Sequence, residues 1–139
     1  PEVEIRVIAP HTLVFTGTRW HVRAYCEKNR GFRDFVLSRF RGEPDLMDES
    51  ENTQDADEAW NTAVDVVIEP DVRLSAEQKS IIETDYGMQD GELRIATRGA
   101  LVQYVLQRYQ IDPNTVLANA AAQQIQVSNL QGLKAWLYT

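Results

Sequence analysis

Arginine, histidine and tyrosine alternate along residues 19–26, the stretch of this sequence whose side chains are best suited to binding or catalysis. Arg19, His21, Arg23 and Tyr25 would share one side of an extended strand, because successive side chains point to opposite faces. Arginine favours planar, bidentate contacts to phosphate and carboxylate groups, and aromatic rings can stack on a base. The pattern fits either an anion-binding pocket or an ordinary solvated strand face, and spacing alone leaves both open.

A second strand predicted over residues 32–40 would add further cations. Its alternation places four side chains on one side: Arg33, Phe35, Leu37 and Arg39. We expect the two strands to be neighbours, so that these arginines lie beside those of the first strand. The combined set would offer several guanidinium groups and a ring on which a ligand could stack.

The sequence gives little support for a set of catalytic or metal-binding residues. His21 and Asp34 could form an acid–base pair with Ser38, but three such residues are expected by chance in a chain of 139 residues. Cys26 and two histidines are the whole supply of nitrogen and sulfur ligands, too few for a conventional zinc site. Glycine-rich phosphate loops and His-Glu-x-x-His motifs are absent. We therefore predict no enzyme, no metal site and no cofactor.

Charge divides the chain into two parts. Residues 1–42 hold eight basic and four acidic residues, a balance of +4, whereas residues 43–139 have a balance of −11. The total of −7 argues against binding nucleic acid with the whole surface. Residues 43–58 contain eight acids and no base, which is typical of a solvated linker. We expect domains at 1–42 and 62–139, joined by an acidic linker at 43–61.

The first part has the pattern of a small β domain. Short strands are predicted at 3–8, 13–15, 19–26 and 32–40, with turn residues between them. In the third strand one face carries Trp20, Val22, Ala24 and Cys26, which we expect in the core. Four or five short strands at this spacing favour a small barrel over βαβ units.

The second part alternates strands and helices. Strands are predicted at 63–69 and 92–97, with a helix between them that begins at a Ser75–Gln78 capping box and ends at Gly87. An apolar stripe predicts a second helix over 98–109. A third helix is expected after Asp112-Pro113, a typical start signal. The whole chain is therefore predicted to be an α+β protein.

A few observations in the sequence bear on the cellular compartment of the protein and on whether a further domain is expected. A single cysteine allows no internal disulfide, which points away from a secreted scaffold. Residues 113–133 are uncharged, but seven of them are Asn or Gln, so they do not form a transmembrane helix. No signal-peptide pattern opens the chain, and it begins with proline. We expect a cytoplasmic fragment whose N-terminal partner domain is missing.

A family resemblance adds to this interpretation. Residues 19–26 (Arg-Trp-His-Val-Arg-Ala-Tyr-Cys) and 32–40 (Phe-Arg-Asp-Phe-Val-Leu-Ser-Arg-Phe) resemble the WYL domain, and residues 10–14 before Gly17 look like its opening. The remainder resembles the C-terminal extension of WYL regulators in bacteria. The sequence variant is similar to the regulators of anti-phage defence systems, the BREX and CBASS repressors. These regulators carry an N-terminal winged helix-turn-helix, a WYL domain and a dimerising C-terminal part.

The resemblance implies a fold and a set of site residues. It implies an Sm/SH3-like β-barrel that senses a nucleic-acid or nucleotide ligand, followed by a small α+β extension. Trp20 and Val22 match core positions of the motif, whereas His21 replaces a ligand-facing tyrosine and Ser38 a frequent aspartate. With the residues singled out above, the expected ligand-binding set is His11, Arg19, His21, Arg23, Tyr25, Arg33, Phe35, Ser38 and Arg39.

The sequence thus predicts the effector-sensing and dimerisation part of a WYL-type transcriptional repressor. The expected partners are an anionic ligand, operator DNA through a separate helix-turn-helix domain, and a second copy of the chain. The dimer contact is expected in residues 113–136, which combine amides with large apolar side chains. That segment could instead pack on its own domain. A different class of function also remains open, in which the basic face binds an acidic surface of a protein partner.

Overall fold

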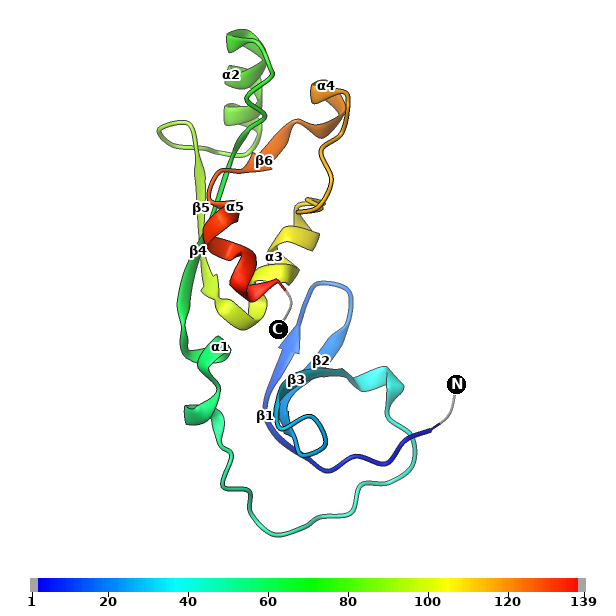
Figure 1. The fold of residues 1–139 in the computed structure, drawn as a ribbon. Helices are drawn as coiled ribbons and strands as arrows, with labels where there is room; N and C mark the ends of the chain where they lie inside the picture. Colours follow the sequence, from blue (N-terminus) through cyan, green and yellow to red (C-terminus); the bar gives the residue numbers. More distant parts are fainter. Residues whose placement is uncertain (1–2, 138–139) are drawn as a thin grey trace. The chain divides into compact units, whose positions relative to one another are not determined.

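The computed structural model describes residues 3–137, which divide after Glu58 into two compact units (Figure 1). The first unit, up to Glu58, contains the basic part of the sequence and the acidic run, and the second begins at Ala59. The chain is an α+β protein, as predicted, with one antiparallel sheet in each unit. The domain limits expected at 1–42, 43–61 and 62–139 stay predictions.

The first unit is built on a three-stranded meander. Strands β1 (Ile8–Phe15), β2 (Trp20–Cys26) and β3 (Gly31–Val36) pair in the order β1-β2-β3. The strand expected at 13–15 is part of β1, whose register shifts at a bulge between Pro10 and Thr12, whereas the strand expected at 3–8 is not formed at residues 3–7. Proline is tolerated there because β1 is an edge strand and its missing N–H breaks no ladder.

This sheet differs from the expectation in two respects. Within residues 3–58 the three strands form an open sheet, so the closed Sm/SH3-like barrel is not found. The strand predicted over 32–40 ends at Val36 and continues as a 3-10 turn, η1 (Leu37–Arg39). A 3-10 turn brings residues three apart onto one side, which removes Leu37 and Arg39 from the strand alternation. After Phe40 the next regular element is the 3-10 turn η2 (Gln54–Ala56).

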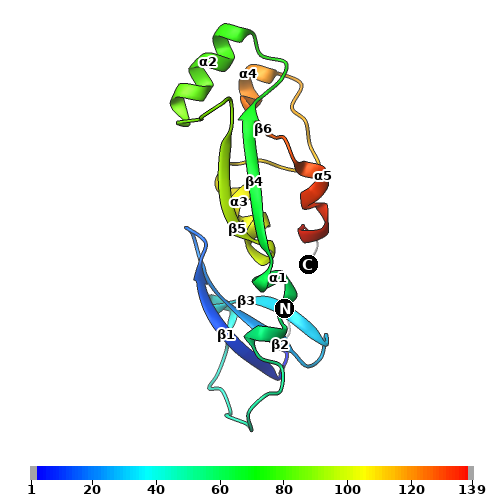
Figure 2. The ribbon, with the colours of Figure 1, turned by 90° about the vertical axis from the view of Figure 1, so that its left-hand side faces the viewer.

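The second unit is organised around strand β4 (Ala63–Pro70), which lies between β5 (Leu93–Arg98) and β6 (Ile125–Val127) and is antiparallel to both (Figure 2). Helix α1 comes directly before β4, α2 connects β4 to β5, and α3 follows β5 through the 3-10 turn η3. Two short helices flank β6, and a 3-10 turn η4 ends the described chain. The bounds are α1 (Glu58–Asn61), α2 (Ala76–Asp85), η3 (Gly99–Leu101), α3 (Val102–Arg108), α4 (Ala120–Gln123), α5 (Leu130–Leu133) and η4 (Lys134–Trp136).

Local signals explain where helix α2 begins and ends. The Ser75 hydroxyl accepts from the Gln78 backbone N–H at 3.2 Å, and the Gln78 side-chain oxygen accepts from the Ser75 N–H at 2.9 Å. This reciprocal capping box confirms the predicted start. Beyond the helix, Gly87 has φ +64°, and Asp90 and Gly91 are left-handed in the turn before β5. Both turn signals are therefore confirmed.

The helix expected after Asp112-Pro113 is not formed. The Asp112 carboxylate accepts from the Asn114 N–H and the Thr115 hydroxyl, at 2.9 and 3.0 Å, and closes a turn. Aspartate, asparagine and threonine compete for the backbone in this way outside helices. Helix α4 begins later, at Ala120, where the Asn119 side chain caps the Ala121 N–H at 2.9 Å. Strand β6, which the sequence analysis missed, then joins the sheet.

One face of the second sheet carries the apolar core of its unit. Val66 and Ile68 of β4 pack with side chains from α2, α3 and the C-terminal segment. The buried members are Val66, Ile68, Leu74, Ile82, Val102, Leu106, Ile125 and Leu133. The segment 113–136 therefore packs largely on its own unit, the alternative left open above. None of the helices among residues 3–137 has the length and apolar character required of a transmembrane helix.

Gly99 shows how closely the end of the chain packs on this core. A Cβ at Gly99 would lie 2.6 Å from Trp136 Cε3, closer than side-chain carbons approach one another. A glycine at this point of the 3-10 turn η3 is therefore required by the indole ring of η4.

We predict that Gly99→Ala lowers the free energy of unfolding by about 1–3 kcal/mol, because the added methyl overpacks against Trp136. Gly132→Ala is the matched control, since a Cβ there meets nothing within 4 Å, and it should be neutral. Urea unfolding followed by circular dichroism measures both. Equal stability of the two variants would show that the indole moves aside without cost.

Candidate ligand-binding site

A buried ion pair lies at the centre of the first unit. The Arg23 Nε donates to Asp57 Oδ2 at 2.8 Å, and its Nη2 donates to Asp57 Oδ1 at 2.9 Å. Side-chain exposure is 3% for Arg23 and 1% for Asp57. The guanidinium fork and the carboxylate therefore meet in the bidentate geometry that arginine favours, inside the protein.

Three further polar side chains complete this cluster. The Arg23 Nη1 donates to Asp34 Oδ1 at 3.2 Å, and His21 Nε2 lies 3.6 Å from the same oxygen. His11 Nε2 is hydrogen-bonded to Asp57 Oδ2 at 2.9 Å. Burial is the largest cause and lowers the pKa of His21 below its usual value. The charge of Asp34, next in size, acts in the opposite direction, and the charge of Arg23 adds a smaller lowering. Burial therefore favours the neutral form of His21.

The strand register places part of the predicted site on this side of the sheet, which we call the ion-pair face. His21, Arg23 and Tyr25 of β2 share it with Asp34 of β3, since residues opposite each other in an antiparallel pair point the same way. His11 reaches it from the β1 bulge. Tyr25 packs edge-on against Phe32, with ring centroids 5.3 Å apart. Strand β2 is thus buried on both faces along most of its length, not solvated on one.

The remaining predicted site residues lie elsewhere. Arg33 is opposite Ala24, and Phe35 is opposite Val22, so both lie on the other side of the sheet. We call that side the tryptophan face, because Trp20 also belongs to it. Arg33 is exposed and Phe35 half-buried. The expected single row of arginines is therefore divided between two faces, because the neighbouring strand pairs with a register that the sequence did not reveal.

Three site residues occupy turns. Arg19 is exposed at the end of the β1–β2 turn, and Ser38 and Arg39 are exposed in η1. Among residues 3–137, no contact brings the Ser38 hydroxyl to the His21–Asp34 pair, and the acid–base triad is not assembled.

Trp20 and Cys26, which were both expected in the core, differ in outcome. Trp20 is 52% exposed, which contradicts its expected place in the core. It comes directly after the turn, at the end of the sheet, where the strand has fewer neighbours to cover it. Trp60 is buried, with the Arg98 guanidinium 4.6 Å from its ring centroid. Cys26 is buried as predicted.

Asp57 is the member of the buried cluster that the sequence analysis missed. It belongs to the acidic run 43–58, which was interpreted as linker because it contains hardly any apolar residue. The signal that could have found it is local: Asp57 and Glu58 end the acidic run, and Ala59 and Trp60 begin an apolar pattern directly after them. An acid at such a boundary is a candidate partner for a buried arginine.

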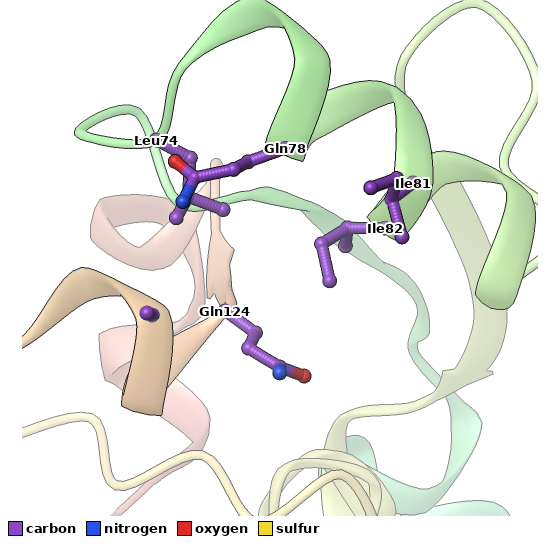
Figure 3. A pocket seen from close by; sticks show the side chains of 6 residues that line it. Leu74, Gln78, Ile81, Ile82 and Gln124 are labelled. Carbon is purple, nitrogen blue, oxygen red and sulfur yellow. The ribbon is translucent and has the colours of Figure 1, made fainter.

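The second unit holds a small apolar pocket of about 130 Å³ between α2 and α4. Figure 3 shows the α2 side chains on one side of it and Gln124 on the other. Its lining is Leu74, Gln78, Ile81, Ile82, Ala121 and Gln124. None of these side chains is titratable, so the pocket offers apolar contact and amide hydrogen bonds but no acid–base chemistry.

Two known families match parts of this chain. Residues 63–133 match the family model described as "BrxR transcriptional regulator, C-terminal dimerization domain", and residues 1–42 match the WYL domain. This chain belongs to the BrxR family of transcriptional regulators. The resemblance to a WYL domain with a regulator-type extension is confirmed, and the prediction of a regulatory chain instead of an enzyme is confirmed with it.

Curated relatives of this BrxR-family chain carry one description. It is 40% identical over 128 residues to a "DNA-binding transcriptional repressor CapW" of Pseudomonas aeruginosa, and 32% identical over 137 residues to one of Stenotrophomonas maltophilia. The alignments cover 92% and 99% of this chain but 42% and 46% of those proteins. A CapW of Escherichia coli is 34% identical over 128 residues, again 42% of its length. The chain thus spans less than half the length of these relatives.

The buried cluster yields a stability prediction. Arg23→Met should lower the free energy of unfolding by about 3–5 kcal/mol, because it leaves the Asp57 and Asp34 carboxylates close together without their cation. Arg33→Met is the matched control on the neighbouring strand, where the guanidinium is exposed, and should change stability by at most about 0.5 kcal/mol. Urea unfolding measures the difference. If Arg23→Met were as stable as the control, the ion pair would not hold this unit together.

Proposed function

We propose that this chain is the effector-sensing and dimerisation part of a bacterial transcriptional repressor. The observation that carries the proposal is the order of the two family matches, WYL followed by the BrxR dimerization domain. The same order is covered by alignments to proteins named as DNA-binding repressors. The resemblance to anti-phage regulators suggests the type of gene that would be controlled, and we place the protein in the cytoplasm.

The effector in this proposal is a nucleic acid or nucleotide that binds the first unit. Support comes from the surplus of cations in residues 1–42 and from the exposure of Arg19, Arg33 and Arg39. These guanidinium groups are free of the buried cluster, which engages Arg23. Exposed arginines can exchange hydrated counterions for phosphate contacts, whereas Arg23 first has to give up Asp57.

Reading of operator DNA is assigned to another part of the longer protein, a helix-turn-helix domain. The helices described here are poor candidates, because α2 carries Lys79 among three acids and α3 carries only Arg108 as a charged residue. Neither helix could neutralise several phosphates of a duplex.

The second unit would form a homodimer with another copy of the chain. Residues 113–119 support this assignment, because Val116 is 75% and Leu117 is 46% exposed in an uncharged loop. The loop backbone is nevertheless fixed: Arg73 donates to the Leu117 carbonyl at 2.8 Å, and the Gln123 side chain accepts from the Leu117 N–H at 2.7 Å. A fixed loop with exposed apolar side chains loses little entropy when a partner covers it.

The effector proposal predicts a loss of affinity when two arginines are removed. Arg33→Ala with Arg39→Ala should weaken binding of a short single-stranded oligonucleotide by about 1.5–3 kcal/mol for each arginine that holds a phosphate, the scale of a hydrogen bond to a charged group. Arg94→Ala, which removes an exposed arginine from the second unit, is the control and should bind like the wild type. Fluorescence anisotropy at low and moderate salt measures the affinities.

Two outcomes would contradict the effector proposal. The first is an absence of binding to wild-type protein at low salt. The second is equal binding by an acidic peptide of the same net charge, which would favour the protein-interaction alternative.

The dimer proposal predicts that one charge in the 113–119 loop separates the copies. Val116→Asp should weaken self-association about 100-fold or more, because an aspartate covered by the partner has no counter-charge in this uncharged loop. Val72→Asp is the matched control, since Val72 is 61% exposed but lies outside the loop. Sedimentation velocity at tens of micromolar protein measures the monomer–dimer equilibrium of each variant. A dimeric Val116→Asp protein would place the contact elsewhere in the second unit.

A further inference from the structure

Two aromatic rings lie exposed at the hairpin end of the tryptophan face. Phe15 is 54% and Trp20 is 52% exposed, and Leu13 beside them is 60% exposed. The ring centroids of Phe15 and Trp20 are 5.1 Å apart, with the planes tilted by 42°. Further along the same face Val22, Ala24 and Cys26 are buried. The apolar surface is therefore concentrated at one end of the sheet.

The hairpin holds this pair in place. Phe15 and Trp20 are opposite each other in the β1–β2 register, directly before and after the turn. The Thr16 N–H donates to the Arg19 carbonyl at 3.0 Å, and Gly17 has φ +104°, which a side-chain-bearing residue rarely adopts. A tight turn fixes the spacing of the rings before any ligand arrives, which reduces the entropy lost on binding.

Two exposed arginines lie near the pair, one beside Trp20 in the sequence and one on the same face of the sheet. No acidic residue occurs between Ile5 and Cys26, the whole of β1, β2 and their turn. Arg19 is exposed next to Trp20. Arg33 is exposed on the same face as Trp20, opposite Ala24, which is about 13 Å along the strand at 3.3 Å per residue. Rings with cations on either side fit a ligand that carries both flat apolar groups and negative charge.

We propose that Phe15 and Trp20 form a stacking platform for the bases of a single-stranded nucleic acid, whose phosphates contact Arg19 and Arg33. This inference rests on the proposed effector-sensing function and names the residues that would contact the bases and the phosphates of the ligand. Stacking needs the face of a base, which a duplex hides between base pairs and a single strand presents. Charge complementarity alone would suit any polyanion, but the exposed rings favour one that carries bases.

The platform is tested with two probes of equal charge: an oligothymidylate of about ten nucleotides and the same backbone with abasic sugars. The oligothymidylate should bind at least about tenfold more tightly, because stacking stabilises each base on a ring. It should also quench tryptophan fluorescence. Trp20→Phe should lose that signal while Trp60 and Trp136 remain, and should keep most of the affinity. An oligouridylate arm separates a preference for DNA from a general affinity for single strands.

Variants test the rings themselves. Trp20→Ala and Phe15→Ala should each reduce oligothymidylate affinity about tenfold and leave abasic binding unchanged. Phe40→Ala is the matched control, because Phe40 is also an exposed aromatic residue, 47% exposed, but lies outside the hairpin. Circular dichroism confirms that each variant is folded, and the comparison of the two probes on wild-type protein needs no variant.

The outcomes separate this inference from the function on which it rests. Equal affinity for the two probes would overturn the platform and leave the anion-binding function intact. Retained oligothymidylate affinity in Trp20→Ala and Phe15→Ala would do the same. If wild-type protein binds neither probe at low salt, the proposed function fails and the platform fails with it.

Discussion

The ion pair between Arg23 and Asp57 is the contact on which the first unit depends. Two opposite charges inside a protein are stable only when each satisfies the other, and here the fork of one meets both oxygens of the other. The pair joins the central strand of the sheet to a segment more than thirty residues further along. A stretch that composition describes as a solvated linker is thereby fixed to the sheet at its last turn.

This pairing also determines which surface remains for a ligand. His11, His21 and Arg23 have the residue types of an anion site, yet their hydrogen-bonding groups are directed at Asp57 and Asp34. The arginines left exposed lie on the tryptophan face and in the turns. The two faces of β2 therefore differ. The ion-pair face contributes stability, and the tryptophan face is exposed to solvent at its Trp20 end.

The sequence patterns predicted several local elements, but they did not predict how the strands pair. The capping box at Ser75, the Asp90-Gly91 turn and the central strand are encoded by neighbouring residues, and all are found. The register of β2 against β3 is not local, and an alternation of arginines on each strand says nothing about which faces coincide. The expected set of site residues is therefore divided between two faces and the turns, and its ligand-binding role stays a prediction. The sequence analysis did not identify Asp57 because its partner, Arg23, is distant in the sequence.

The missed strand β6 has a similar origin. Its three residues are too few to show a period, and the signal of Asp112-Pro113 favoured a helix before it. The strand exists because Pro70 and Ile68 of β4 present an edge on which Ile125 and Val127 can pair. Tertiary pairing, not local preference, decides the structure of this segment.

The topology of the two sheets has a consequence for biosynthesis. The first sheet joins neighbouring strands through hairpins, which close within microseconds once the residues leave the ribosome. The second sheet cannot be completed until residues 125–127 have left the ribosome, because one edge of β4 pairs with β6. At about 5–20 residues per second the chain spends seconds with β4 exposed along one edge. The unit that matches the dimerization model can therefore associate with a second copy only after residues 125–127 have been made.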